Sequence, residues 1–304
     1  MQRYLGMRLF QIVIALLIIS IIVFVLVRLS GDPARLLAPP DASKEEYEAI
    51  RHNLGLDKAI FLQFVNFFSL LVRGDFGTSF RWHAPALELV LGRFPATLTL
   101  ACAGFLISVV IGFPLGIVAA VRKGSIWDTL ARILATLGQS IPVFWVGIML
   151  ILTFSVDLRI LPVSGRGGLK HLILPAVTLS SFSVSALVRL TRSSMLDVLG
   201  SEYVKMARIK GVPEILVIMK HALRNALIPL VTIAGMQLAA LLTGAIVTEV
   251  VFAWPGIGRL SVEAVIARDF PVVQAAVFIF AVTYLTMNLI VDMLYCYIDP
   301  RIRY

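Results

Sequence analysis

Charged residues are scarce in this chain of 304 residues: they make up 15% of it, against 59% for hydrophobic residues. Soluble domains carry about 25% charged residues, so the composition argues against a soluble protein. Several apolar runs reach about 20 residues, the length at which a helix crosses a bilayer core of about 30 Å. The sequence therefore predicts an all-α, polytopic membrane protein.

Cysteine and histidine are also rare. Cys102 and Cys296 lie in or beside apolar runs that are far apart in the sequence, so they predict neither a disulfide framework nor a metal site. The four histidines are scattered along the chain: His52, His83, His171 and His221. We interpret each of them as a surface or interface residue rather than as a metal ligand.

Motifs that would indicate catalysis are missing as well. The sequence contains no G-x-x-x-x-G-K-[ST], H-E-x-x-H or C-x-x-C, and "GRGGLKH" at 165–171 has its glycines and lysine in the wrong arrangement for a phosphate-binding loop. We therefore expect no catalytic residue, no metal and no cofactor. If the chain takes part in active transport, a separate protein must supply the energy.

Six apolar segments are predicted to span the membrane. Their approximate bounds are 9–29, 97–121, 134–156, 172–190, 228–251 and 272–295. With the N-terminus inside, the inside loops carry fourteen Lys and Arg residues and the short outside loops carry five. Because positive charge favours the cytoplasmic side, both termini are predicted to be cytoplasmic. Loops close to anionic lipid also explain the net charge of +9 without nucleic acid.

The segment between the first two spans is predicted to be external and helical. Ser43 and Glu46 have the spacing of a capping box, and Gly55 is a helix stop. The apolar stretch 60–72 is too short to span, so we interpret it as an interfacial or packed helix; a seventh span there would disturb the charge bias. We expect three regions: an anchor with the external segment (1–95), a transmembrane domain with a coupling loop at 193–228 (96–297) and a tail (298–304).

Polar side chains occur within or beside the spans. Arg189, Glu249 and Asp292 lie near the ends of spans, and Gln139, Gln237 and Asn288 lie deeper. Such groups face a bundle interior or a water-filled path, or more simply snorkel and form hydrogen bonds between helices. The three amides are our candidates for the translocation path.

Two glycines surround a proline in the second span. The motif "GFPLG" places Gly112 and Gly116 four positions apart around Pro114. Small residues at this spacing allow two helices to approach closely, and proline kinks a helix. The motif predicts a closely packed, kinked helix and is a structural signal only.

A charged stretch, 201–230, interrupts the apolar pattern. The residues from Glu202 are good helix formers, Gly211 suits a helix end, and Pro213 suits the first position of a second helix. The stretch therefore predicts two short helices joined by a tight turn. In the first helix one face carries Tyr203, Met206 and Ala207, with Lys210 at its edge.

Three interpretations of this stretch compete. A DNA-binding helix-turn-helix fits its charge but not its membrane context, and a basic loop that touches lipid headgroups is the simplest alternative. A helix that docks on a soluble cytoplasmic partner fits the two faces better, because a helix this short needs a partner surface to be stable.

The stretch resembles the cytoplasmic signature loop of permeases of binding-protein-dependent ABC importers. Glu202, Ala207 and Gly211 match the first part of that signature. Much of the superfamily has Leu-Pro where this chain has Leu-Arg, and "HALRNALIP" is typical of the dipeptide, oligopeptide and nickel branch. The residues that carry this second part are His221, Arg224, Asn225 and Pro229. Further motifs in the same order are "GDPA", "LGLD", "GDFGTSF", "RFPATLTLA", "EVVFAWPGIG" and "DPRIR".

The resemblance implies a type I ABC importer transmembrane domain with six transmembrane helices. It implies a non-catalytic permease subunit in a bacterial inner membrane, paired with a second homologous permease subunit. Two cytoplasmic ATP-binding subunits and an external solute-binding protein would complete the importer. The helix of Glu202, Tyr203, Met206, Ala207, Lys210 and Gly211 would dock on an ATPase subunit.

Two questions stay open at this point. Di- or oligopeptide uptake is the main hypothesis for the cargo, and nickel or glutathione are alternatives within the same branch. A secondary transporter or channel that needs no ATP is the alternative of a different class; such proteins often show inverted repeats or deep ionisable residues, and here the deep groups are mainly amides.

Overall fold

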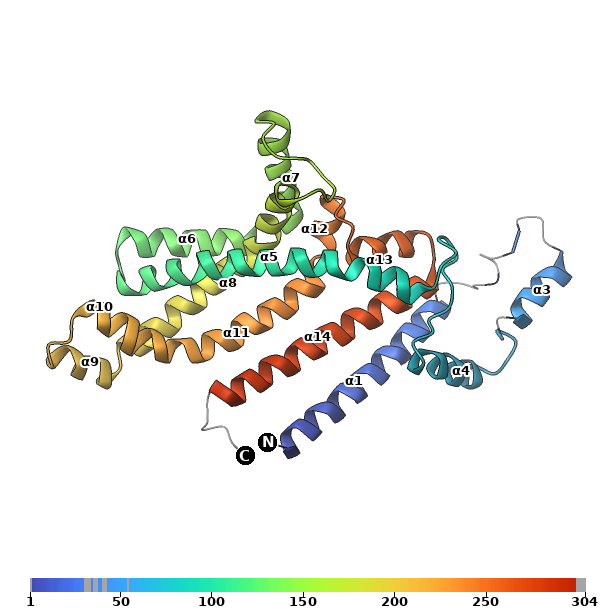
Figure 1. The fold of residues 1–304 in the computed structure, drawn as a ribbon, viewed down its shortest axis with the longest axis horizontal. Coiled ribbons are helices and arrows are strands. Elements are labelled where there is room, and N and C mark those ends of the chain that lie inside the picture. Colours follow the sequence, from blue (N-terminus) through green and yellow to red (C-terminus); the bar gives the residue numbers. More distant parts are fainter. Residues whose placement is uncertain (1, 30–33, 35–37, 40–42, 54, 299–304) are drawn as a thin grey trace. The chain divides into compact units, whose positions relative to one another are not determined.

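The computed structural model describes residues 2–29, 34, 38–39, 43–53 and 55–298, so the predicted tail lies almost entirely outside the described residues. The described residues are helical apart from turns and loops, with one isolated bridge between Thr78 and Pro85. The chain divides into two compact units (Figure 1). Unit 1 comprises residues 1–95 and 256–285, and unit 2 comprises 96–255 and 286–304.

Unit 1 combines the N-terminal part of the chain with a later segment, residues 256–285. Its helices are α1 (Gln2–Leu29), α3 (Lys44–Asn53), α4 (Ile60–Val72) and α13 (Ile257–Ile266), with the first parts of α5 (Ala86–Val121) and α14 (Phe270–Ile298). Its core joins both parts of the chain, because Leu71, Phe76 and Val90 cluster with Ile257 and Val272. The loop 74–85 is fastened to the α13–α14 corner.

A buried carboxylate makes that fastening. Asp269 is fully buried, and it accepts hydrogen bonds from the Ser79 hydroxyl and from the backbone N–H of Arg81 at 3.1 Å. The Ser79 hydroxyl oxygen in turn accepts from the backbone N–H of Trp82 at 2.8 Å. A buried charge is tolerated where hydrogen bonds replace water, so this network holds the loop against the corner.

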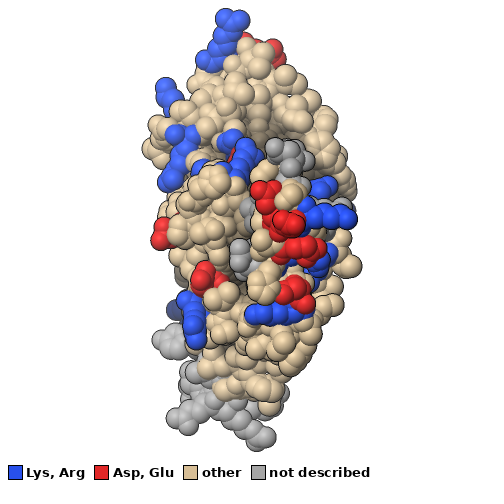
Figure 2. Space-filling view, turned by 90° about the vertical axis from the view of Figure 1, so that its right-hand side faces the viewer, with Lys and Arg blue, Asp and Glu red and all other residues tan. Residues whose placement is uncertain are grey.

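The two helices predicted between the first two spans are present. The backbone N–H of Ser43 donates to the Glu46 carboxylate at 2.8 Å, and the N–H of Glu46 donates to the Ser43 hydroxyl at 3.2 Å, which confirms the capping box at the start of α3. Gly55 follows α3 with a φ of +65°, as a helix stop requires. Figure 2 looks from the side on which α3 lies in Figure 1, and acidic and basic side chains are intermixed on this face.

Helix α4 packs beside α1. The Arg28 guanidinium donates to the Gln63 side-chain oxygen at 2.9 Å from Nε, and it lies over the Phe24 ring at 3.7 Å from the ring centre. Phe24 also meets Phe64 edge to face, with ring centres 5.3 Å apart. The opposite side of α4 exposes large apolar residues, Phe61 among them. This amphipathic arrangement is typical of a helix at a membrane interface.

Unit 2 is a bundle arranged around α8 (Leu169–Leu199). Its other helices are α6 (Ile126–Ser140), α7 (Val143–Leu150), η1 (Ile151–Asp157), α9 (Glu202–Ile209), α10 (Glu214–Leu216), η2 (Val217–Ala222), α11 (Leu223–Gly244) and α12 (Ile246–Val251), with the later parts of α5 and α14. Figure 1 shows α5, α6 and α11 alongside α8, and α9 and α10 at one end of this bundle.

Two of the six predicted spans are not straight helices. Among the described residues, four helices are long and apolar enough to span, and two bent pairs raise the number to six. The predicted span 134–156 bends by 102° between α6 and α7, because extended residues at Ile141 and Pro142 interrupt the helix. The predicted span 228–251 begins beside a bend of 54° next to Pro229 and breaks again at Ala245.

Helix ends also differ from the predicted bounds. Helix α5 begins at Ala86 rather than at 97, and α6 begins at Ile126 rather than at 134. Both helices begin before the apolar run that was predicted to span, because polar residues continue a helix wherever backbone hydrogen bonds and caps allow it. Helix α5 runs through Pro114 without a break.

Glycine allows α5 and α8 to touch. A methyl group on Gly112 would lie 2.8 Å from Cβ of Leu187, and one on Gly116 would lie 2.5 Å from Cβ of Thr191 and 2.9 Å from the carbonyl oxygen of Val188. These separations are below van der Waals contact, and backbone atoms cannot move aside as a flexible side chain can. The close packing predicted from "GFPLG" is confirmed.

We predict that Gly116→Ala destabilises unit 2 by about 1–3 kcal/mol, the usual cost of overpacking. Gly92→Ala on the same helix is the matched control, because a methyl group there meets nothing within 4 Å. Thermal unfolding of the purified protein in detergent should show a lower midpoint for Gly116→Ala alone. Equal midpoints for the two variants would contradict the close contact.

Candidate functional site

The candidate site is the helix α9, which begins two residues after α8 ends. Ser201 precedes it in an extended conformation, and Glu202 opens it. An acidic residue at this position complements the positive end of the helix dipole. The Glu202 carboxylate also accepts from the Lys205 ammonium at 2.7 Å, on the exposed side of the helix.

Gly211 ends α9 as predicted. Its φ is +75°, its N–H donates to the carbonyl of Arg208 at 2.9 Å, and the N–H of Val212 donates to the carbonyl of Ala207 at 3.2 Å. This pair of bonds is the Schellman ending of a helix, which favours glycine because of the positive φ. The second helix follows at once, with Pro213 at the capping position just before Glu214 rather than inside the helix.

Helix α9 has a buried and an exposed face. Val204 is fully buried and Ala207 nearly so, in a small core with Val217. Tyr203 and Met206 are 45% and 52% exposed. The structure therefore separates residues that the sequence placed on one face: Ala207 belongs to the face that anchors the helix to its own chain.

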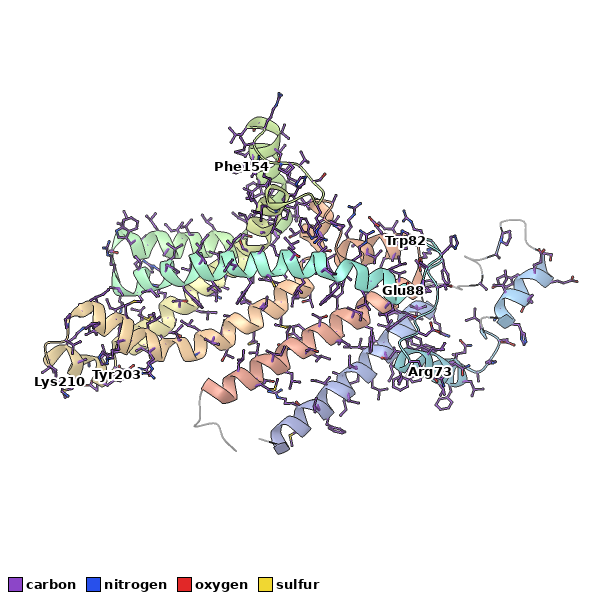
Figure 3. All side chains as sticks on the ribbon, in the orientation of Figure 1. Arg73, Trp82, Glu88, Phe154, Tyr203 and Lys210 are labelled. Atoms are coloured by element: carbon purple, nitrogen blue, oxygen red, sulfur yellow. The ribbon has the colours of Figure 1, made fainter. Side chains whose placement is uncertain are left out.

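The exposed face is apolar at its centre and basic at its edge. Ile209 is 79% exposed and extends the apolar surface beyond Tyr203 and Met206. Lys210 is exposed as well, and Figure 3 shows Tyr203 and Lys210 at the same end of the bundle. Exposed apolar clusters with a polar rim mark protein interaction sites.

An ion pair braces the turn after α9. Arg208 donates to both carboxylate oxygens of Glu214, at 3.1 Å from Nε and 2.7 Å from Nη2. The pair spans Gly211 and joins α9 to α10, and the carboxylate raises the pKa of Arg208. A two-point contact of this kind fixes geometry more than a single charge contact does. Gly211 therefore allows the turn, and the Arg208–Glu214 ion pair holds the two helices on either side of it together.

The chain then continues without a gap into α11, which belongs to one of the predicted spans. Helix α10, the π-helical turn η2 and α11 are contiguous, and π-helical turns occur often at functional sites. The residues of the "HALRNALIP" motif lie on this path. His221 is half-buried, Arg224 is exposed, and the Asn225 amide donates to the carbonyl of His221 at 2.8 Å. Pro229 lies inside α11, where it supplies no N–H to the helix.

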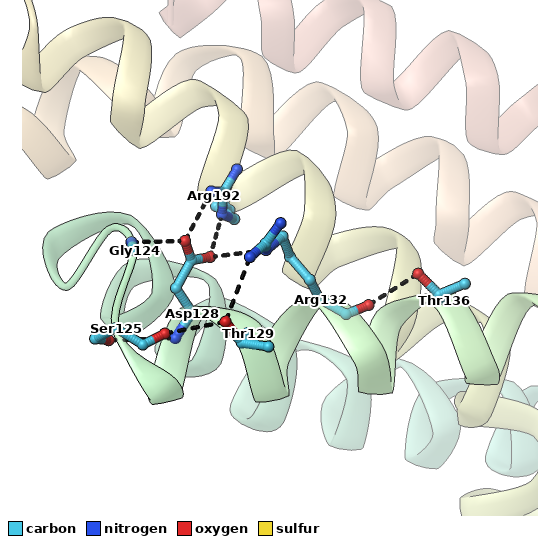
Figure 4. A network of polar contacts seen from close by, with 7 residues as sticks. All are labelled: Gly124, Ser125, Asp128, Thr129, Arg132, Thr136 and Arg192. Atoms are coloured by element: carbon cyan, nitrogen blue, oxygen red, sulfur yellow. Dashed lines mark hydrogen bonds and ion pairs between the residues drawn. The ribbon is translucent and has the colours of Figure 1, made fainter.

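A second polar network ties α6 to α8 (Figure 4). The Asp128 side chain is 2% exposed, and Arg192 donates to both of its oxygens, at 2.6 Å and 3.0 Å. The N–H of Gly124 donates to the same carboxylate at 3.0 Å, and Arg132 lies 3.5 Å from it. Because Arg192 is close to the end of α8, this network fixes the part of α8 that leads into α9.

The three candidate path residues lie on different helices. Gln139 is half-buried on α6 and lines a pocket between α6 and α8. The Gln237 amide nitrogen on α11 is buried, and within the described residues it has no hydrogen-bond partner. Asn288 is half-buried on α14. Among the described residues no hydrogen bond joins these three side chains, so their role in the path stays a prediction.

Sequence reasoning did not single out the two ion pairs. Asp128 and Arg192 are 64 positions apart, and no local pattern connects them. Ser125 three residues before Asp128 does carry a signal, because a serine at this spacing caps a helix, and the N–H of Asp128 donates to its hydroxyl at 3.4 Å. Arg192 could be identified as the partner of the Asp128 carboxylate only from the packing of α6 on α8.

These observations define a class of protein. The chain is a multi-pass helical membrane protein without a visible nucleotide-binding motif, and it presents a short charged helix with an exposed apolar face. That is the architecture of a permease subunit driven by a separate ATPase.

Comparison with protein families gives the same answer. Residues 112–304 match the model described as "Binding-protein-dependent transport system inner membrane component", and residues 1–101 match its N-terminal counterpart. The chain belongs to this family of inner-membrane permeases of ABC importers, in the dipeptide, oligopeptide and nickel branch. ATP is hydrolysed by separate subunits in this family, so the alternative of an ATP-independent transporter is wrong.

Curated relatives match over the whole chain. The glutathione transport system permease protein GsiC of Salmonella typhimurium strain LT2 is 44% identical over 305 residues, with 100% of both chains covered. The protein of the same name from Escherichia coli strain K12 is 43% identical with the same coverage.

Solved structures support the fold. Two inward-facing crystal forms of the MetNI methionine ABC transporter match with TM-scores of 0.57 and 0.59, at 19% and 20% identity. In both cases the match covers 69% of this chain and 96% of that chain. The type I importer fold predicted from the sequence is confirmed.

We predict that Asp128 and Arg192 are energetically coupled. Asp128→Asn and Arg192→Gln should each lower the midpoint of thermal unfolding, whereas the double variant should lose less than the sum, with a coupling of about 1–3 kcal/mol. Arg132→Gln is the control, because its side chain is 56% exposed and its contact is longer. Additive losses in the double-mutant cycle would show that the pair is not an interacting unit.

Proposed function

We propose that α9 is the helix through which this permease receives the closing motion of an ATPase subunit. The observation that carries the proposal is the division of α9 into an anchored face, with Val204 and Ala207, and an exposed apolar face, with Tyr203, Met206 and Ile209. An exposed apolar face of this size on a charged helix suits a groove in a soluble partner.

The same geometry suits a lever. The buried face and the Arg208–Glu214 pair make α9 and α10 move together, and α10 continues into η2 and α11. A push on α9 is then transmitted to a membrane helix rather than absorbed by a flexible loop. For that push to drive transport, the ATPase contacts must differ between the inward- and outward-facing states.

The complete importer would contain more than this chain. We propose a heterodimer with a second homologous permease subunit, two cytoplasmic ATP-binding subunits and an external solute-binding protein. Family membership supports an ATPase partner and a binding protein; the heterodimer and the number of subunits belong to the proposal.

The proposed cargo is a small peptide. The relatives that match over the full length are named for glutathione transport, and glutathione is itself a modified tripeptide. This supports peptide-like cargo within the branch and makes glutathione the first compound to test, ahead of nickel.

We predict that Met206→Asp and Ile209→Asp each reduce uptake at least about tenfold while the chain still reaches the membrane, because a charge on the docking face opposes burial against a partner. Lys205→Ala is the matched control on the same helix, because its ammonium pairs with Glu202 on the exposed side and is not part of the apolar face. Uptake, membrane level and co-purification of the ATPase subunits should be measured together.

Gly211→Pro and Glu202→Lys test the lever separately from the docking face. Proline cannot adopt the φ of +75° at Gly211 and removes the N–H that donates to Arg208. Glu202→Lys reverses the charge at the start of α9. Both variants should insert normally and fail to transport. Normal uptake by both variants would contradict the proposed role of α9.

The cargo is tested by competition uptake in a strain that lacks this chain and is complemented with it. Labelled glutathione, a dipeptide and nickel should be offered in turn, each against unlabelled competitors. We expect saturable uptake of glutathione or the dipeptide that depends on the chain. Chain-dependent uptake of nickel with neither peptide would overturn the proposed cargo and leave the permease role unchanged.

A further inference from the structure

A polar pocket lies between α6 and α8. Its volume is about 500 Å³, within the range of small-molecule sites. Its lining comes from these two helices alone: Arg132, Ala135, Thr136, Gln139, Ser140, Val188, Arg189, Arg192 and Ser193. Only two of these residues, the alanine and the valine, are apolar. Such a lining is unusual for a surface that meets lipid tails, and it suits a hydrated solute.

The pocket carries an excess of positive charge. Three of its lining residues are arginines and none is acidic. The neighbouring Asp128 carboxylate pairs with Arg192 at 2.6 Å and with Arg132 at 3.5 Å, so it offsets one of the three charges. Arg189 is exposed, and in the described part of the chain no carboxylate lies within ion-pair distance of it. One guanidinium is therefore free to bind an anion.

Neutral groups complete the lining. The hydroxyls of Thr136 and Ser140 donate to carbonyls of their own helix, each at 2.9 Å, so they offer acceptors to the pocket rather than donors. Gln139 and Ser193 have no hydrogen bond to another described residue and can donate into the pocket. A carboxylate that binds here would meet Arg189 with one or two neutral donors beside it.

We propose that this pocket binds a carboxylate group of the transported peptide as it passes through the membrane chain. A guanidinium and a carboxylate match in shape and charge and form paired hydrogen bonds. Every small peptide with a free C-terminus presents such a group, and glutathione presents two. The inference rests on the proposed peptide cargo and adds a recognition site within this chain.

The arrangement also explains how such a site can release its ligand. Conduction needs binding that is strong enough to attract a solute and weak enough to let it leave. Asp128 already engages two of the three arginines, which leaves a single strong partner for the ligand. The wall that carries Arg189, Arg192 and Ser193 belongs to α8, which is linked to α9 by Gly200 and Ser201, so a displacement of α9 that passes through this link would change the pocket.

The test measures the charge and the occupancy of the pocket with cysteine reagents. In a Cys102→Ser/Cys296→Ser background, Ser193→Cys reports on the pocket, and Ser194→Cys, one position further round α8 and outside the lining, is the matched control. The complete importer in lipid nanodiscs is treated with the anionic sulfonatoethyl or the cationic trimethylammonioethyl methanethiosulfonate. Dialanine and its C-terminal amide are then added as probes.

We expect the ratio of anionic to cationic modification rates to be about fivefold or more higher for Ser193→Cys than for Ser194→Cys, since nearby unpaired charge attracts the anionic reagent. Adding Arg189→Gln should remove most of that difference. Dialanine should slow modification of Ser193→Cys severalfold, and its amide should not. Gln139→Cys on the facing helix provides a second reporter.

Equal ratios at the two serine positions, or protection by the amide as well as by the acid, would overturn the proposal. Protection by phosphatidylglycerol in the nanodisc and not by dialanine would show a lipid headgroup site and would also overturn it. If neither reporter reacts, the pocket is closed to solutes and the proposal fails. Uptake of dialanine by the unmodified importer is measured in parallel, because its absence would contradict the cargo rather than the pocket.

Discussion

Helix α8 lies close against α5, α6 and α7 because these three neighbours carry glycine where they meet it. Gly112 and Gly116 of α5 leave room for Leu187 and Thr191, Gly138 of α6 faces Ser185, and Gly147 of α7 lies against Thr178. In a membrane the lipid is as apolar as a leucine side chain, so helices associate through close packing and hydrogen bonds rather than through release of water. The bundle depends on this contact surface. The polar network at Asp128 and the pocket at Arg189 both require α6 to lie directly on α8.

Much of the architecture was predictable from the sequence because hydropathy and helix caps are local signals. The span at residues 9–29, the apolar helix of residues 60–72, the capping box at Ser43 and the turn at Gly211 all follow from a few neighbouring residues. The break at Pro142 was hidden inside a segment that is apolar on average, because hydropathy measures transfer into lipid and does not depend on the direction of the helix axis. A proline in a membrane helix can be tolerated or can end the helix, and its surroundings decide which.

The candidate site was predicted in outline and not in its contacts. Helical spacing grouped Ala207 with Tyr203 and Met206, yet Ala207 turns inward because Val217, which follows ten residues later across a glycine turn, provides the surface for it. The Arg208–Glu214 and Asp128–Arg192 pairs depend on how the chain folds back. The spacing of these residues in the sequence does not predict that they are in contact. The proposed coupling helix and the pocket are close in the chain, because α8 forms one pocket wall and two residues separate its end from α9. The proposed docking face and the pocket are therefore joined through a link of two residues, Gly200 and Ser201.

The core of unit 1 has a consequence for how the protein is made. Phe76 and Val90 meet Ile257, Val272 and their neighbours there, and Asp269 fastens the loop 74–85 through Ser79. During synthesis these partners leave the ribosome nearly two hundred residues apart. The N-terminal part of unit 1 must wait, without the surface on which it finally packs, until almost the whole chain has been translated. Most of unit 2 lies between them in the sequence, so the contacts that fasten the loop 74–85 are among the last to form.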